Sequence, residues 1–172
     1  MNLKNIKEQV PGQVKIGDEA QATIIGELNS LLAEEFQAWY QYFIVAPFLV
    51  GDMRPEIQEF FNKTADDELN DHAQLLINRI NELNGECFLK TPESWKQFAN
   101  ADFLVADLDV NSQLDINGEA ENKAIQHYQQ VIEIAESLKD YTTRDILKKI
   151  LADEEQHLSE INDFIKDINS KI

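Results

Sequence analysis

Hydrophobic residues recur at three- and four-residue steps along four long segments of the chain, and this period predicts four amphipathic helices. The first apolar stripe covers residues 25–45 and follows Asp18 and Gln21, whose spacing is typical of a capping box at a helix start. The second stripe covers residues 57–83 and ends at Asn84-Gly85, a pair that favours helix termination. The first half of the chain is therefore predicted to form a helical hairpin.

Two further stripes, over residues 114–138 and 147–168, predict a second helical hairpin. Ser112 and Thr142, each followed three residues later by an aspartate, are the expected starts of its helices. No stretch shows the alternation of apolar and polar residues that is typical of a β-strand. The pattern therefore favours an all-α fold.

The two predicted hairpins are joined by a long irregular connection, residues 85–111, with one short helical candidate at about residues 91–100. A connection of this length is expected to cross the molecule rather than to turn a tight corner. We therefore expect a four-helix bundle over residues 18–172 whose long crossover carries a short helix, preceded by an N-terminal arm over residues 1–17.

The composition narrows the classes of function that the bundle can have. With 32 acidic and 15 basic residues, the chain of 172 residues has a formal net charge of -17, which favours cations and opposes binding to nucleic acid or anionic membranes. Residues 1–19 carry three lysines against three acidic residues, so direct DNA binding is not expected. No secretory leader or membrane-spanning run is visible, and we expect a cytoplasmic protein.

Six ionisable residues occupy positions on the apolar stripes, where leucine or isoleucine is the usual choice. Their spacing repeats: in each half, two glutamates lie 33 residues apart and a histidine follows the second glutamate by three or four residues. The six residues are Glu35, Glu68, His72, Glu121, Glu154 and His157.

Helical geometry brings these residues together. In an antiparallel hairpin, two residues equidistant from the turn lie at the same height, and the midpoint of Glu35 and Glu68 is the predicted turn at Gly51-Asp52. A histidine three or four residues after a glutamate shares its helix face. Four buried carboxylates need compensation, which two divalent cations would supply. Oxygen and imidazole ligands without thiolate favour iron or manganese over zinc.

Four other residues carry polar or reactive side chains whose places the sequence also predicts. Tyr42 and Tyr128 each lie seven residues after the first glutamate of their half, so each is expected on the same helix face as that glutamate. Their possible roles are core packing, hydrogen bonding to the ligands, or acting as radical sinks. His127 points off the stripe and is interpreted as a surface residue. Cys87 is the only cysteine, so an internal disulfide is excluded. We interpret Cys87 as a packing residue.

Three segments resemble the ferritin superfamily, and bacterioferritin in particular. They are Leu31-Leu32-Ala33-Glu34-Glu35, His72-Ala73-Gln74-Leu75-Leu76 and Ile150-Leu151-Ala152-Asp153-Glu154-Glu155-Gln156-His157. The resemblance covers roughly residues 20–170. It implies a ferroxidase that binds two Fe(II) per chain at the six residues named above, oxidises them with O2 or H2O2, and stores the ferric product in a hollow homo-oligomeric shell.

The chain departs from the bacterioferritin pattern in the second helix. The family's glutamate lies three positions before the histidine, where this chain has Leu69, and Glu68 is one position further back. Either a regular helix or a π-bulge would still present Glu68 as a ligand and place Leu69 in the core. The family's haem-binding methionine is replaced by Asn70, so no haem is expected.

The sequence continues only a few residues beyond the fourth predicted helix, and no counterpart of the fifth helix of bacterioferritin is expected. In this respect it resembles Dps-like proteins with an intrahelical di-iron site, which implies a shell of about twelve chains. Two alternatives remain open at this point. One is a di-manganese catalase or another di-metal oxidase that stores nothing, and the other is a purely structural helical bundle.

Overall fold

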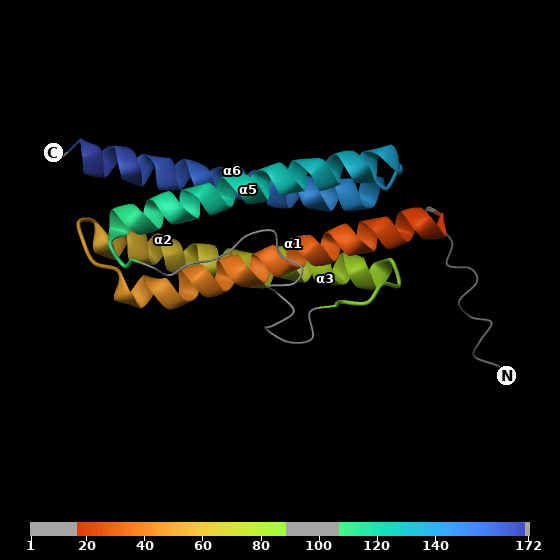
Figure 1. Ribbon diagram of the computed structural model, residues 1–172, viewed down its shortest axis with the longest axis horizontal. Helices are drawn as coiled ribbons and strands as arrows, with labels where there is room; N and C mark the ends of the chain where they lie inside the picture. The colour runs from red at the N-terminus through yellow and green to blue at the C-terminus, as the bar shows by residue number, and fades with distance from the viewer. Residues whose placement is uncertain (1–16, 89–106, 171–172) are drawn as a thin grey trace.

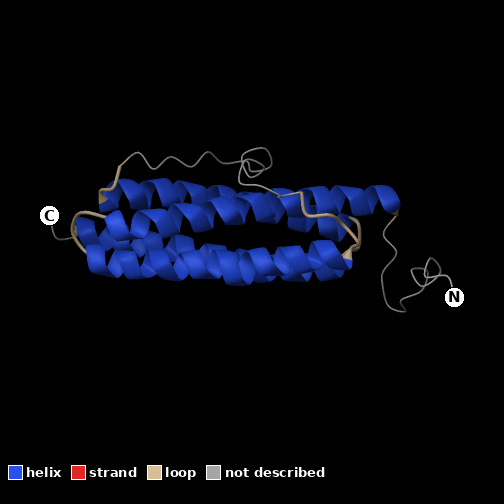
Figure 2. Ribbon diagram, turned by 90° about the horizontal axis from the view of Figure 1, so that it is seen from below, coloured by secondary structure: helices blue, strands red, loops and turns tan. Residues whose placement is uncertain are grey.

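The computed structural model describes residues 17–88 and 107–170, and within these ranges the chain is helical apart from short connections and one isolated bridge (Figure 1, Figure 2). This confirms the predicted all-α four-helix bundle. The predicted arm up to residue 16 and the helical candidate at residues 91–100 lie outside the described residues. Among the described helices, none is long and apolar enough to cross a membrane.

Two helical hairpins make up the described part of the chain. The first hairpin consists of α1 (Asp18–Val45), a 3-10 turn η2 (Ala46–Phe48), α2 (Arg54–Asp66), the π-helical segment η3 (Asp67–His72) and α3 (Ala73–Glu82). The second consists of α5 (Val110–Ser137) and α6 (Tyr141–Asn169). Segments α2, η3 and α3 follow one another without a break and act as the second long helix of the bundle (Figure 1).

The helices of the second hairpin start slightly earlier than the sequence indicated. Asp109 caps α5 and Asp140 caps α6, and each side chain accepts a hydrogen bond from a backbone N–H of the first turn. The expected caps at Ser112 and Thr142 are therefore wrong by three residues and two residues, because an aspartate upstream supplies each cap.

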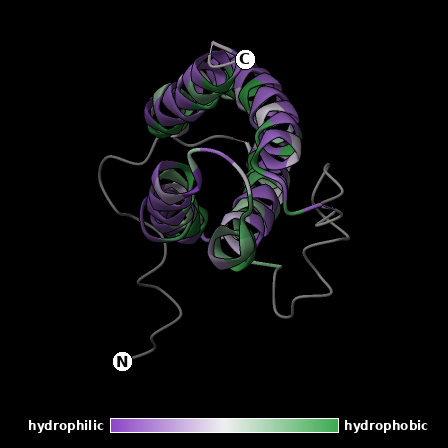
Figure 3. Cartoon of the chain, turned by 90° about the vertical axis from the view of Figure 1, so that its left-hand side faces the viewer, coloured by the Kyte–Doolittle hydropathy of each residue, from purple (hydrophilic) through white to green (hydrophobic). Residues whose placement is uncertain are grey.

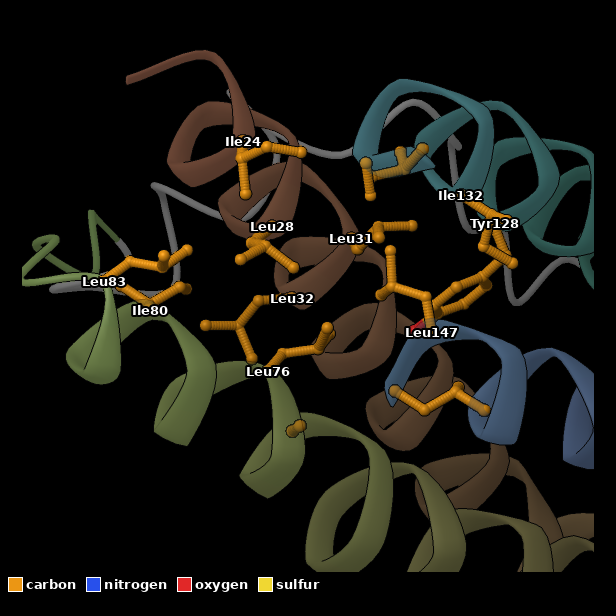
Figure 4. Close-up of a cluster of buried hydrophobic side chains, with 14 residues drawn as sticks. Ile24, Leu28, Leu31, Leu32, Leu76, Ile80, Leu83, Tyr128, Ile132 and Leu147 are labelled. Atoms are coloured by element: carbon orange, nitrogen blue, oxygen red, sulfur yellow. The ribbon is translucent and has the colours of Figure 1, made fainter. Parts of the chain in front are cut away.

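The core consists of two apolar clusters, one toward each end of the bundle. The first cluster includes Ile24, Leu28, Leu32, Leu76, Ile80, Tyr128 and Leu147 (Figure 4). The second cluster includes Tyr42, Val45, Ile57, Phe61, Leu114 and Ile161. Each cluster takes residues from both hairpins, so burial of apolar surface clamps the hairpins together at two levels. The stretch between the clusters is where the six polar stripe residues lie.

The hairpins pack so that α1 lies beside α5, while α2 and η3 lie beside α6. Hydrogen bonds join α1 to α5 at Tyr42 and Glu121, and ionic contacts join α2 to α6 at Lys63 and Glu160. A parallel bridge between Val50 and Asp109 ties the α1–α2 connection to the start of α5. Hydrophobic and hydrophilic residues alternate around each helix, as expected for amphipathic helices around a shared core (Figure 3).

Candidate metal centre

The six predicted ligands converge between the two apolar clusters. Each is nearly inaccessible to solvent, with exposed fractions from 1% for Glu68 and His72 to 4% for Glu121. Glu35 comes from α1, Glu121 from α5, and the two Glu/His pairs come from η3 and α6. Because buried carboxylates are stable only when paired or bound to a cation, their convergence requires compensating charge.

The ligand atoms form two overlapping groups, each of the size that one metal ion requires. Within each group the candidate atoms lie within 4.8 Å of one another. One group comprises Glu35, Glu68, His72 and Glu154, and the other comprises Glu68, Glu121, Glu154 and His157. Two carboxylates, those of Glu68 and Glu154, belong to both groups. The arrangement therefore suits a pair of cations joined by two shared carboxylates.

Both histidines turn the same ring atom, Nδ1, toward the carboxylates. His72 Nδ1 lies 3.1 Å from Glu68, 3.1 Å from Glu154 and 3.2 Å from Glu35. His157 Nδ1 lies 3.5 Å from Glu68 and 3.8 Å from Glu154. Among the described residues, neither His157 Nδ1 nor Glu68 Oε1 has a hydrogen-bond partner, although both atoms are buried. A bound cation would satisfy both atoms.

The pKa shifts follow from packing four carboxylates with two imidazoles. Burial, followed by the nearby charge of Glu154, raises the pKa of Glu68 and of Glu121 well above the usual value. Burial also opposes ionisation of Glu154, but the adjacent imidazoles of His157 and His72 outweigh burial and lower the pKa of Glu154. Burial disfavours the charged form of His72, but its contacts with three carboxylates raise its pKa. Protons therefore supply the charge balance that divalent cations would otherwise provide.

Two tyrosines hold the outer glutamates in a crossed arrangement. The Tyr42 hydroxyl on α1 donates to Glu121 on α5, and the Tyr128 hydroxyl on α5 donates to Glu35 on α1. Burial is the main cause that raises the pKa of both phenols, so they remain donors. The predicted positions next to the cluster are confirmed, and each tyrosine fixes the orientation of one carboxylate across the hairpin interface.

Two aspartates contact the far side of the histidine rings, and sequence reasoning missed both. Asp153 lies 3.5 Å from His72 Nε2, and Asp67 lies 3.4 Å from His157 Nε2. A carboxylate behind a metal-binding imidazole orients the ring and increases its basicity. Each aspartate directly precedes the glutamate of a Glu/His pair, and this repeated Asp-Glu step is the signal that could have identified them.

The extra residue between Glu68 and His72 is absorbed by a π-helical segment. Residues 67–72 form η3, and the backbone N–H of Ala73 donates to the carbonyl of Glu68, five residues back. Of the two alternatives for this segment, the π-bulge is therefore the one observed. Leu69 is only half-buried, so its expected place in the core is wrong. The wider turn directs Glu68 and His72 inward and leaves Leu69 partly exposed.

The interpretation of His127 as a surface residue is also wrong. Its ring is 9% exposed and lies between α5 and α1, with Nδ1 2.8 Å from Glu34 and Nε2 3.6 Å from Glu27. Burial favours the neutral ring, but the hydrogen bonds to these two carboxylates outweigh burial and raise the pKa of His127. Cys87 is half-buried and packs against the first apolar cluster.

The sequence and fold of this chain are similar to those of known proteins. A family model described as Ferritin-like domain matches residues 25–170. The chain is 38% identical to a dodecameric thioferritin, the bacterioferritin-related protein of Bacteroides fragilis, with a TM-score of 0.84 over 88% of this chain and 89% of that one.

Two more distant structures share the fold. A ferritin-like, diiron-carboxylate protein from Bacillus anthracis is 25% identical, with a TM-score of 0.71 over 86% of this chain and 99% of that one. Dps from Thermosynechococcus elongatus is 16% identical, with a TM-score of 0.80 over 86% of this chain and 92% of that one.

Proposed function

Because the chain belongs to the ferritin-like domain family, we propose that it is a ferroxidase that oxidises Fe(II) and stores the ferric product inside an oligomeric shell. The observation that carries this proposal is the pair of overlapping ligand groups that share Glu68 and Glu154. Four carboxylates balance the charge of two divalent ions, and two imidazoles complete the ligand set without thiolate. This donor set suits iron.

The residues have distinct roles in the proposed reaction. Glu35 with His72, and Glu121 with His157, each bind one Fe(II), while Glu68 and Glu154 bind both ions and hold them close together. Two Fe(II) ions lose one electron each, and one H2O2 takes up these two electrons with two protons to give two water molecules. With O2 as the oxidant, two electrons and two protons give H2O2. Tyr42 and Tyr128 keep the outer carboxylates in place during the change in charge.

Storage in a shell is the second part of the proposal. It is supported by the 38% identity to the B. fragilis protein, which is dodecameric, over 88% of this chain. It is also supported by large exposed apolar side chains on α1 and just after it, because such a surface is typical of subunit contacts. We propose a closed homo-oligomer of about twelve chains.

Anaerobic titration with Fe(II), followed by addition of O2 or H2O2 and by sizing of the product, tests this function. We expect a tight class of about two Fe(II) per chain, oxidation of both ions, and a mineral-containing particle of shell size. Saturation at one ion, or none, would refute the dinuclear site. Tight binding of Mn(II) with steady H2O2 dismutation and no mineral would instead identify a catalase.

A further inference from the structure

The metal centre is reached from the side by a narrow passage between α1 and α5. This passage has a volume of about 60 Å³, and its inner end includes Glu68, Glu121 and Tyr42. Its walls include Ala38 from α1 with Ala120 and Ala124 from α5, and its rim includes Glu34, Lys123 and His127. A cavity needs about 10–15 Å³ of such space to hold one water molecule. The passage therefore has room for a few water-sized molecules.

Alanine side chains are what keep this passage open. Ala120 and Ala124 lie four residues apart, on one face of α5, and Ala38 lies on the opposite wall. Each of the three alanines is half-buried, and each ends in a methyl group, which leaves space where a longer side chain would fill it. A larger side chain at any of the three positions would occupy the space that leads to the carboxylates.

The inner end of the passage is formed by Glu68, one of the two carboxylates that both ligand groups share. Glu68 is 1% exposed and lines the passage, and its Oε1 atom has no hydrogen-bond partner among the described residues. A small molecule that travels down the passage would therefore meet a polar atom at the two ligand groups.

The charge at the rim does not favour cations. Glu34 contacts His127, and Lys123 adds a positive charge. The opposite side of the bundle is different: a groove of about 210 Å³ between η3 and α6 is lined by Asp67, Asp71 and Asp153 with a single lysine, Lys63, among the described residues. A negative field concentrates cations. The two sides of the centre therefore differ in charge: the groove between η3 and α6 is acidic, and the rim of the α1–α5 passage is not.

From these observations we propose that the α1–α5 passage is the route by which the small uncharged oxidant, O2 or H2O2, reaches the metal centre. This role rests on the proposed ferroxidase function and adds an access route to it. The small volume of the passage, about 60 Å³, excludes large molecules, and its rim gives Fe(II) no electrostatic advantage.

The substitution Ala124→Leu tests the passage, because an isobutyl group replaces a methyl group on its wall. The assembled protein is loaded with Fe(II) without oxygen and then mixed with O2 or with H2O2, and oxidation is followed by absorbance. Anaerobic binding of Co(II) is followed separately, by its visible bands. Ala22→Leu, at an exposed position of α1 outside the passage, is the matched control, and Ala124→Ser changes the wall without closing it.

We expect Ala124→Leu to slow oxidation by roughly tenfold or more with the oxidant that uses the passage, at unchanged Co(II) stoichiometry and binding rate. Slowing with O2 alone, H2O2 alone or both supports the route and identifies the oxidant. Ala22→Leu and Ala124→Ser should behave like the parent. Parent-like oxidation by Ala124→Leu would overturn the route, and so would equal slowing of Co(II) binding. Failure of the parent protein to bind or oxidise Fe(II) would instead refute the ferroxidase function itself.

Discussion

Glu68 and Glu154 have equivalent places in the two hairpins, and each belongs to both ligand groups. Removal of either carboxylate would leave each metal position with one ligand fewer and would leave the remaining charges unbalanced. Glu35 and Glu121 each serve only one position, so their loss would be less damaging. The shared carboxylates are therefore the residues on which a two-metal reaction depends most.

We predict that Glu68→Ala abolishes fast iron oxidation while the shell still assembles, because the change removes a bridging carboxylate and no apolar contact. Stopped-flow absorbance after mixing with oxidant measures the rate, and size-exclusion chromatography measures assembly. Glu155→Ala, an exposed glutamate beside Glu154 on α6, is the control and should oxidise iron like the parent. Equal rates for Glu68→Ala and the parent would show that the wrong residue has been assigned.

His127 gives a pH-dependent prediction. Its pKa is raised in the folded chain, so its contribution to stability is fully present below about pH 6.5 and is lost as the pH rises through the folded value. Glu34 and Glu27 on α1 face the ring, and Lys123 is the nearest cation along α5. We therefore expect His127→Gln to lower the free energy of unfolding more at pH 6 than at pH 9.

Urea unfolding of the metal-free protein at the two pH values measures this difference. Glu34→Gln should reduce the pH dependence of the His127→Gln effect, because the principal partner of the ring is then uncharged. A loss of stability that is the same at both pH values would contradict a charged His127 in the folded chain.

At the scale of the helices, the π-helical segment η3 decides how the second helix meets the centre. Leu69 was expected in the core with either a regular helix or a π-bulge, but η3 turns Glu68 and His72 inward and leaves Leu69 half-buried. Burial of Leu69 therefore contributes less than burial of a leucine on the regular face of α3.

We predict that Leu69→Ala lowers the free energy of unfolding by about 1 kcal/mol, whereas Leu76→Ala lowers it by about 2–5 kcal/mol. Leu76 is fully buried in the first apolar cluster, so its truncation leaves a cavity that Leu69→Ala does not. Denaturant unfolding of the two variants under identical conditions provides the comparison. An equal loss for both would indicate that Leu69 is in the core after all.

The helices and the six candidate ligands could be predicted from the sequence because both depend on one local rule, the 3.6-residue period. A glutamate or histidine on an apolar stripe must face the interior, whatever the details of packing. Contacts across the hairpin interface follow no such rule. The positions of Asp67 behind His157, and of Glu34 beside His127, depend on how α6 and α5 are placed against the first hairpin, which the sequence pattern does not contain.

At the scale of the whole molecule, the described surface carries an apolar area on α1 and the connection after it. Tyr40, Phe43, Phe48 and Val50 are each about half exposed, with values from 49% to 58%, and Phe43 stacks on Trp39. Exposed aromatic side chains in a group are costly in water and favour association between protein surfaces. This area is the expected place of subunit contact in the proposed shell.

We predict that Phe43→Glu reduces assembly to smaller species at micromolar concentration, because it places a charge in an apolar contact. Native mass spectrometry measures the assembly, and circular dichroism shows whether the helices remain. Lys123→Glu, which also introduces a negative charge but on exposed α5, is the control and should leave the shell intact. An intact shell in Phe43→Glu would place the subunit contact elsewhere.

The two apolar clusters lie on either side of the proposed metal centre and bear on how it would exchange its ions. Proteins that depend on a metal to hold their chain together cannot release it without unfolding. Here Leu28, Leu76 and their neighbours clamp one end of the bundle, and Ile57, Phe61 and Ile161 clamp the other. We therefore expect the metal-free and metal-bound states to share one backbone, so that the proposed centre binds and releases its ions without unfolding.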